Sequence, residues 1–322
     1  MQTTWLSVSE TAEWLSNRDN FLILTHRRPD GDTLGSAAGL CHALRKIGKR
    51  AYVLNNAETG ARYLDYIAPY YAPAQFSPET IITVDTADVS MFARHTEAYL
   101  DRVDLCIDHH ISNTGYATYT CNLPTRAACG EVVYEILMAL LGEIDAVAAL
   151  PLYVALATDT GCFAYANVTA ETLDIAGKLV LAGADHAKVN KTLFRTKTRG
   201  RIALEGVLYT TMRYYHDAKT AVSVITTALM TETGATEDDI DDIAALPNQV
   251  EGVLVGLTIR ELGDNICKVS VRTGGQLSAN EICHPFGGGG HTMAAGCVVK
   301  QSPEDTAAAV IAVVGELFLS RE

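Results

Sequence analysis

Residues 21–36, with the sequence FLILTHRRPDGDTLGS, join a short apolar run to a polar turn and then to a helical pattern. The turn carries His26, Asp30 and Asp32, directly after the residues that predict a strand. In an open α/β sheet, ligands bind in the crevice beyond the carboxyl ends of the strands. Carboxylate oxygens and imidazole nitrogens suit divalent cations such as manganese, magnesium or zinc. This stretch therefore predicts a strand that brings metal ligands to the edge of a parallel sheet.

Three further apolar runs stop on the same kinds of residue, and we expect each of them to be a strand of that sheet. They are IITV before Asp85, VDLCI before Asp108, His109 and His110, and YVALAT before Asp159. Taken singly, an Asp at a strand end is usually a turn former or a helix cap, and a lone His is usually structural. Four such ends in one chain predict instead a single site assembled from distant segments.

Through residue 185, apolar strands alternate with helical patterns. Residues 32–47 have helical periodicity and stop before Gly48, and residues 129–141 and 169–182 are also expected to be helices. This alternation predicts an α/β domain in which a parallel sheet carries helices on both faces.

A basic segment marks the boundary to a second domain. Residues 188–201 hold six Lys or Arg and no acid, and we interpret them as part of a solvated linker helix. The alternative is that they line an interdomain cleft and attract an anionic substrate. Beyond them, TAVSVITTAL, VEGVLVGLTIREL and ICKVSVRT predict strands of a smaller mixed α/β domain. We expect a metal-binding domain over residues 1–186, a linker helix over 187–204 and a second domain over 205–322, with a cleft between the domains.

The second domain contains a glycine-rich stretch, FGGGGHTMAAG at residues 286–296. Glycine repeats alone are typical of an ordinary flexible loop. Here they lead into a run of small residues, TMAAG, which we interpret as the start of a helix. Exposed backbone N–H groups at a helix start can hold a phosphate, aided by the helix dipole.

Composition restricts the kind of partner. The formal net charge of −13 over 322 residues argues against a long basic groove for duplex DNA or RNA, so any nucleic-acid substrate is expected to be short. The first residues lack the basic and apolar pattern of a signal peptide, and no apolar run is long enough to span a membrane. A cytoplasmic protein is therefore expected. The oligomeric state stays open, with a homodimer among the options.

Taken together, these motifs resemble the DHH family of phosphoesterases, in the subgroup with a DHH-associated C-terminal domain. HRRPDGDTLGS, VDTAD, DHH and TDTG occur in the order of the family, and GGGGHTMAAG is similar to the signature of its second domain. The resemblance implies a phosphoesterase with two divalent ions, manganese being expected. The implied substrates are short RNA, cut from the 3′ end to nucleoside 5′-monophosphates, and the 3′-phosphate of 3′-phosphoadenosine-5′-phosphate. A cyclic di-AMP or pApA phosphodiesterase and a non-catalytic nucleotide sensor are the alternatives.

The resemblance also implies a division of roles among the residues. One metal would take His26, Asp30 and Asp85, and the other would take Asp32, Asp85, His109 and Asp159. Asp85 would serve both ions, and two metals that share a ligand can promote an in-line displacement at phosphorus. His110 would act near the scissile phosphate as a proton donor or charge stabiliser. Asp88 and Asp108 would orient imidazoles, with a local capping role as the alternative for each.

For substrate binding, the resemblance points to the second domain. The implied residues are Arg272, Gly288, Gly289, Gly290 and His291. The guanidinium of Arg272 suits a phosphate, although an exposed arginine at a strand end can also be a solvated surface residue. Two aromatic residues after the TDTG motif, Phe163 and Tyr165, are candidates for base stacking, but core packing is the favoured interpretation for both.

Overall fold

The computed structural model describes residues 3–240 and 243–321, and it divides into two compact units, Met1–Thr196 and Lys197–Glu322. The helices of the first unit are α1 (Val8–Ser16), α2 (Gly31–Lys46), α3 (Leu64–Ile67), α4 (Cys129–Leu141), α5 (Ala146–Asp159), α6 (Ala170–Leu181) and α7 (His186–Asn190). The helices of the second unit are α8 (Arg199–Thr211), α9 (Thr227–Thr233), α10 (Ala279–Cys283) and α11 (Pro303–Leu319). None of the helices in the described ranges is both long enough and apolar enough to cross a membrane.

The first unit is built on a six-stranded sheet with the order β1-β6-β5-β4-β2-β3, and every strand pair in it is parallel. Its strands are β1 (Thr4–Trp5), β2 (Phe21–Leu24), β3 (Ala51–Val53), β4 (Thr80–Val84), β5 (Leu105–Asp108) and β6 (Tyr119–Asn122). The register pairs Leu24 with Thr83 and Val84 with Ile107, so β2, β4 and β5 end at the same level. The residues that follow these three strands therefore emerge along one edge of the sheet.

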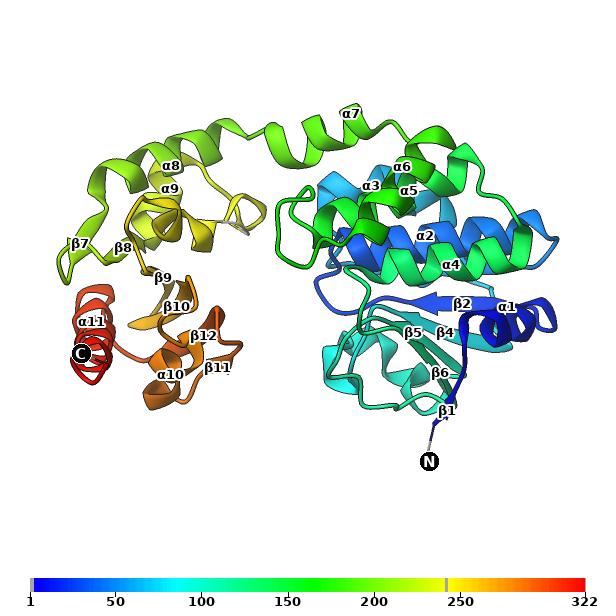
Figure 1. The fold of residues 1–322 in the computed structure, drawn as a ribbon, viewed down its shortest axis with the longest axis horizontal. Helices are drawn as coiled ribbons and strands as arrows, with labels where there is room; N and C mark the ends of the chain where they lie inside the picture. Colours follow the sequence, from blue (N-terminus) through cyan, green and yellow to red (C-terminus); the bar gives the residue numbers. More distant parts are fainter. Residues whose placement is uncertain (1–2, 241–242, 322) are drawn as a thin grey trace. The chain divides into compact units, whose positions relative to one another are not determined.

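Both faces of β2, β4 and β5 are buried, which explains why these strands are largely apolar. Phe21 and Ile23 of β2 face a core shared with α1, α2, α4 and α5. Figure 1 shows α2, α4 and α5 along one side of the strands. Leu22 and Leu24 face the other side, where Phe92 and short 3-10 segments cover them. The predicted α/β architecture is confirmed, with 3-10 turns in place of long helices on the second face.

The prediction of a strand for YVALAT is wrong, because these residues belong to helix α5. Periodicity alone cannot separate a buried strand from a buried helix in an apolar run, and the Ala and Leu content of α5 favours a helix. Its packing against α2 is close: a Cβ on Gly35 would lie 2.2 Å from the carbonyl oxygen of Pro151. Asp159 is therefore the last residue of a helix, not the residue after a strand.

The basic segment forms parts of two helices, not one linker helix. Residues 186–195 comprise α7 and a π-helical turn, and a new helix, α8, starts at Arg199. Thr198 starts α8 because its hydroxyl accepts a hydrogen bond from the N–H of Arg201 at 2.9 Å, as an N-cap residue does. The division between the two compact units falls between Thr196 and Lys197, just before this cap.

The second unit contains a mixed sheet with the order β11-β12-β10-β9-β8-β7, in which β8 and β9 are parallel and the other pairs antiparallel. Its strands are β7 (Arg213–Tyr215), β8 (Thr220–Ile225), β9 (Val255–Gly263), β10 (Ile266–Thr273), β11 (Gly289–Gly290) and β12 (Ala294–Val299). The predicted mixed domain is confirmed. One predicted strand, TAVSVITTAL, ends early because Thr226 caps helix α9.

The glycine-rich stretch is a strand hairpin and not the start of a helix. β11 pairs with β12, and Gly290 has a φ of +151°, which side chains rarely adopt. A Cβ on Gly290 would lie 2.5 Å from the carbonyl oxygen of Ala294, so the hairpin requires glycine there. The small residues therefore allow two strands to approach closely, and the helix-dipole argument for phosphate binding does not apply.

Candidate metal centre

The ends of β2, β4, β5 and α5 bring carboxylates and imidazoles together in the first unit. Three groups of ligand atoms each lie within 4.8 Å of one another: His26, Asp30 and Asp85; Asp32, His109 and Asp159; and Asp85, His109 and His110. We call the six residues His26, Asp30, Asp32, Asp85, His109 and Asp159 the Asp85 cluster. Asp85 lies between its two imidazoles, with Oδ2 3.6 Å from His26 Nε2 and Oδ1 3.4 Å from His109 Nε2.

The remaining distances in the cluster leave room for cations. His26 Nε2 is 3.7 Å from Asp30, and His109 Nε2 is 3.7 Å from both Asp32 and Asp159. These separations are longer than hydrogen bonds. Ligand atoms about 2.0–2.2 Å from one ion lie roughly 3 Å apart at right angles, which is close to the spacing here. The donor set and its spacing therefore fit divalent cations.

The carboxylate of Asp85 is the part of the cluster that most clearly fits a bound cation. Its side chain is buried, and Oδ1 accepts no hydrogen bond among the described residues. A buried polar atom normally has a partner, and a cation between the carboxylate and an imidazole would supply one. The Asp85 backbone has a φ of +54° and donates its N–H to Ile107 at 2.9 Å. Strained backbone of this kind is concentrated at functional sites.

Backbone carbonyls orient both imidazoles of the cluster. His26 Nδ1 lies 2.7 Å from the carbonyl oxygen of Arg27, and His109 Nδ1 lies 3.1 Å from that of Arg126. With Nδ1–H donating to a carbonyl, Nε2 is the nitrogen available to a metal. The contribution of Arg126 was missed by sequence reasoning, because no local pattern shows that this carbonyl meets His109.

Asp32 is held by the start of helix α4. Its carboxylate accepts hydrogen bonds from the N–H groups of Cys129 at 2.7 Å and Gly130 at 2.9 Å, and from the hydroxyl of Ser36 at 3.2 Å. The positive end of the helix dipole also stabilises a carboxylate at this position. The N-terminus of α4 is thus a part of the site that the sequence motifs do not reveal.

The charged groups of the Asp85 cluster shift one another's pKa values. Burial lowers the pKa of His26, but the carboxylates of Asp30 and Asp85 outweigh it and raise this pKa to about 11. The carboxylates around His109, led by Asp85, likewise outweigh burial and raise its pKa to about 10. Burial raises the pKa of Asp159 to about 6, with Asp85 adding to the effect. Protons on the imidazoles therefore balance the carboxylates until cations replace them.

These pKa shifts predict that metal binding releases protons. With pKa values of about 11 and about 10, His26 and His109 are expected to be protonated at neutral pH without metal, whereas a metal ion binds neutral imidazole. Since protons compete with the ions, we expect manganese affinity to rise with pH up to about pH 10 to 11, where the two imidazoles lose their extra protons. Isothermal titration calorimetry in buffers of different ionisation enthalpy measures the protons released. A binding enthalpy that does not depend on the buffer would contradict this expectation.

Asp108 orients the neighbouring histidine. Its buried carboxylate lies 2.8 Å from His110 Nδ1, accepts the backbone N–H of His109 at 2.8 Å, and accepts the Asn113 amide at 2.6 Å. The hydrogen bond to Asp108 is the main cause of a raised pKa for His110. The imidazole of His110 is thereby held beside the cluster by a carboxylate that favours its protonated form.

The interpretation of Asp88 as a residue that orients an imidazole needs correction. Its carboxylate accepts the N–H of Ser90 at 2.8 Å and caps the 3-10 helix Val89–Met91. Within the described residues, Asp88 has no hydrogen bond or ion pair with a histidine. Asp88 precedes a turn whose free N–H groups need an acceptor, which is the local capping role given as the alternative.

This difference between the two aspartates is testable. We expect Asp108→Asn to lower the catalytic rate by about 10- to 100-fold, the usual cost of losing an outer partner of an active-site imidazole. Asp88→Asn should leave the rate close to that of the unmodified protein, because Asp88 touches no imidazole. Steady-state kinetics on both purified variants measure this, and equal losses would argue against the separation of roles.

The predicted substrate residues lie close together in the second unit. Arg272 of β10 pairs with Ala294 of β12, and the N–H of His291 donates to the carbonyl of Ala294 at 2.8 Å. Gly289, Gly290 and His291 are exposed. The structure thus brings Arg272 and the glycine hairpin to one end of the sheet.

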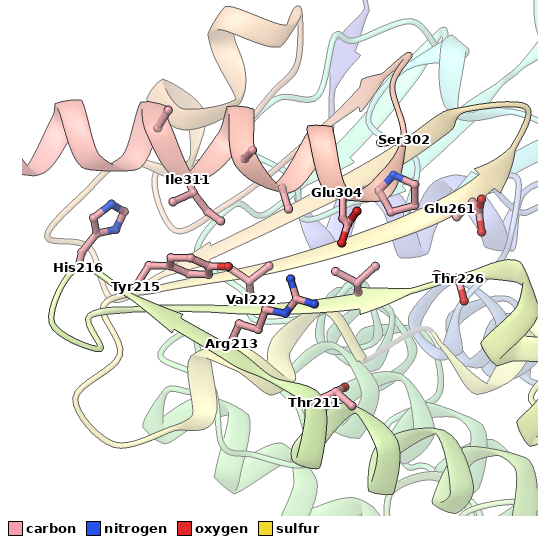
Figure 2. A pocket seen from close by; sticks show the side chains of 15 residues that line it. Thr211, Arg213, Tyr215, His216, Val222, Thr226, Glu261, Ser302, Glu304 and Ile311 are labelled. Carbon is pink, nitrogen blue, oxygen red and sulfur yellow. The ribbon is translucent and has the colours of Figure 1, made fainter.

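A cavity of about 890 Å³ lies elsewhere in the second unit, between β7, β8 and α11. Figure 2 shows Val222 of β8 and Ile311 of α11 on its apolar walls, with Arg213 reaching in from β7. None of the predicted site residues lines this cavity, so it is separate from the site that the motifs indicate.

A parallel sheet with hard ligands gathered at its carboxyl edge is the architecture of a metal-dependent hydrolase. The chain belongs to the DHH family. The model of the DHH family, N-terminal domain, matches residues 20–158, and the model of the DHHA1 domain matches residues 217–318. The family resemblance of the sequence motifs is thereby confirmed.

Three other proteins are similar to this chain over most of its length. The bifunctional oligoribonuclease and PAP phosphatase NrnA of Thermus thermophilus is 33% identical over 281 residues, covering 86% of this chain and 83% of that protein. The cyclic-di-AMP phosphodiesterase PdeA of Listeria monocytogenes is 23% identical and covers 89% of this chain, which spans 46% of that protein. The crystal structure of an exopolyphosphatase-related protein from Bacteroides fragilis matches with a TM-score of 0.87 at 21% identity. This structural match covers 96% of this chain and 95% of the Bacteroides fragilis chain, and it shows that the two proteins share a fold.

Proposed function

We propose that this protein is a two-metal phosphoesterase that hydrolyses short RNA oligonucleotides from the 3′ end. The products would be nucleoside 5′-monophosphates, and the same site would remove the 3′-phosphate of 3′-phosphoadenosine-5′-phosphate. The observation that carries the proposal is the Asp85 cluster, in which one buried carboxylate lies between two imidazoles. The NrnA relative, which is similar over most of both chains, supports the choice of substrate.

The cluster would hold two divalent ions. We assign His26, Asp30 and Asp85 to one ion, and Asp32, Asp85, His109 and Asp159 to the other. Two divalent ions activate a water molecule and neutralise charge on the phosphoryl oxygens. We propose manganese for both, because the mixture of carboxylate and imidazole ligands suits it. The buried Asp85 oxygen without a hydrogen bond supports a shared ligand at this position.

His110 would handle a proton beside the ions. Asp108 binds Nδ1 of the imidazole and raises the pKa of His110, which favours the form with a proton on both nitrogens. A protonated imidazole can donate to the leaving oxygen or stabilise charge on the phosphate. Asp85 and His110 are therefore the residues to which we assign catalytic roles.

We further propose that the second unit binds a substrate phosphate. Arg272 would contact it with its guanidinium and His291 with its imidazole, and the hairpin residues Gly288, Gly289 and Gly290 would let it approach the backbone closely. Arginine geometry suits phosphate, and glycine backbone, which carries no side chain, allows a ligand to approach closely. The proximity of Arg272 to the hairpin through Ala294 supports a common role.

Hydrolysis of cyclic di-AMP or its linear product pApA is the second candidate. A relative that carries this activity in its name matches most of this chain, although the chain spans about half of that protein. Cyclic di-AMP, pApA and the proposed substrates share adenosine and phosphodiester or terminal phosphate groups. The cluster acts on the phosphate in each case, so it does not distinguish among them.

The test is product analysis by chromatography after incubation of the purified protein with manganese. The substrates are a dinucleotide, 3′-phosphoadenosine-5′-phosphate, pApA and cyclic di-AMP at equal concentration. We expect the first two to be hydrolysed with the highest kcat/KM. Preferred cleavage of cyclic di-AMP would support the second candidate, and binding of all four without hydrolysis would support a nucleotide sensor.

A further inference from the structure

Tyr165 departs from the expectation that both aromatic residues after the TDTG motif pack in the core. Phe163 does pack against the core, and its ring lies 5.8 Å from that of Tyr153. Tyr165, by contrast, is 60% exposed, although it is a large and partly apolar side chain. It stands six residues after Asp159 of the Asp85 cluster, so an exposed aromatic ring lies on the loop that follows a proposed metal ligand.

The backbone of this loop is held tightly. Gly161, Cys162 and Phe163 have φ values of +56°, +58° and +65°, and left-handed backbone at two successive non-glycine residues persists only when its surroundings enforce it. The carbonyl of Thr160 accepts the N–H groups of Ala164 at 2.9 Å and Tyr165 at 3.1 Å. The loop therefore sets the position of Tyr165 by backbone bonds.

A second restraint ties the loop to the proposed ligand. The side-chain amide of Asn167 donates to the carbonyl of Asp159 and to that of Ala127, each at 3.1 Å. The ring of Tyr165 packs on Gly161, because a Cβ there would lie 2.4 Å from Cε1 and Cζ. The ring is thus fixed against backbone two residues from Asp159 and still presents most of its surface to solvent.

We propose that Tyr165 stacks on a nucleobase of the substrate, next to the phosphate that is cleaved. This inference rests on the proposed function. Stacking between an aromatic ring and a base is tolerant of sequence, because every base has a π-face. A ring that is already positioned loses little conformational freedom on binding. Tyr165 would therefore let the site prefer nucleotides over other phosphoesters without selecting one base.

The test compares Tyr165→Ala with Tyr165→Phe on three substrates: pApA and two analogues of it that each lack one adenine. Tyr209→Ala is the matched control, since Tyr209 is a half-exposed tyrosine of α8 in the second unit. We expect Tyr165→Ala to lower kcat/KM on pApA by about 5- to 150-fold, mainly through KM. On one of the two analogues this loss should disappear. Tyr165→Phe and the control should stay close to the unmodified protein.

A structural role for Tyr165 would give a different result. An equal loss of kcat/KM on all three substrates, or no loss on pApA, would overturn the stacking proposal. Calorimetric titration with manganese checks that the Asp85 cluster still binds metal in Tyr165→Ala. If it does not, Tyr165→Leu keeps apolar contact with Gly161 but has no π-face, and it should show the same dependence on the base. An unmodified protein that hydrolyses none of these three substrates and neither the dinucleotide nor 3′-phosphoadenosine-5′-phosphate would instead contradict the proposed function.

Discussion

Replacing Asp85 is expected to lower hydrolysis of a dinucleotide by more than about 100-fold, the upper end of what loss of an outer-shell partner costs at a metal site. The reason is its position: one oxygen faces His26 and the other faces His109, so one substitution weakens both proposed ions. Asp85→Asn is the preferred variant. Asparagine tolerates the left-handed backbone at this residue, whereas alanine would add strain.

Controls separate loss of metal from loss of fold. Asp174→Asn removes an exposed carboxylate that pairs with Lys178 on α6, and a surface ion pair of this kind contributes little to stability. This variant should keep full activity. Steady-state kinetics with manganese provide the comparison. An Asp85→Asn protein that retained more than a tenth of the activity with two ions bound would rule out Asp85 as a shared ligand.

Manganese is expected to raise the unfolding temperature of the protein and its removal by a chelator to abolish activity. The carboxylates of Asp32, Asp85 and Asp159 each have an oxygen within 3.7 Å of His109 Nε2, and cations relieve the repulsion between them. An ion at one hundred times its Kd stabilises the folded state by about 2.7 kcal/mol. For a unit of this size, that corresponds to a rise of roughly 5–10 °C for each ion. Differential scanning calorimetry with and without metal measures the shift.

The same measurement on the variants shows where the ions bind. Asp85→Asn should lose most of the manganese-dependent shift, and Asp174→Asn should keep all of it. An unmodified protein whose unfolding temperature did not change with saturating manganese would contradict an accessible, reversible site. Activity that survived exhaustive chelation would contradict metal dependence itself.

Much of the first unit could be predicted because its strands carry two local signals. The apolar run of β2 marks a strand buried on both faces, and the polar residues directly after it mark the carboxyl edge of a sheet. The same two signals precede Asp85 and His109. Since β2, β4 and β5 end in register, residues that are far apart in sequence but equivalent along their strands had to converge.

The errors arose where an apolar or small-residue pattern is compatible with two structures. YVALAT fits either a buried strand or a buried helix. In the structure these residues belong to helix α5, which packs closely against α2. TMAAG fits either the start of a helix or a closely paired strand. In the structure its last residues belong to β12, which pairs with β11. The position of Asp88 is compatible with a capping residue or with a partner of a histidine. In the structure the turn folds so that its carboxylate accepts the N–H of Ser90.

The sequence by itself determined which chemical groups are present and that a parallel sheet would gather them. The alternation of strands and helices along the chain and the residues at the strand ends are local properties. Only the tertiary structure decided how those groups are held. The N-terminus of α4 binds Asp32, the Arg126 carbonyl orients His109, and the loop after Asp159 leaves Tyr165 exposed. The first two are contacts between segments distant in sequence, and the third depends on what packs around a loop. Their geometry depends on how helices pack on the sheet, and no pattern within one segment contains that information.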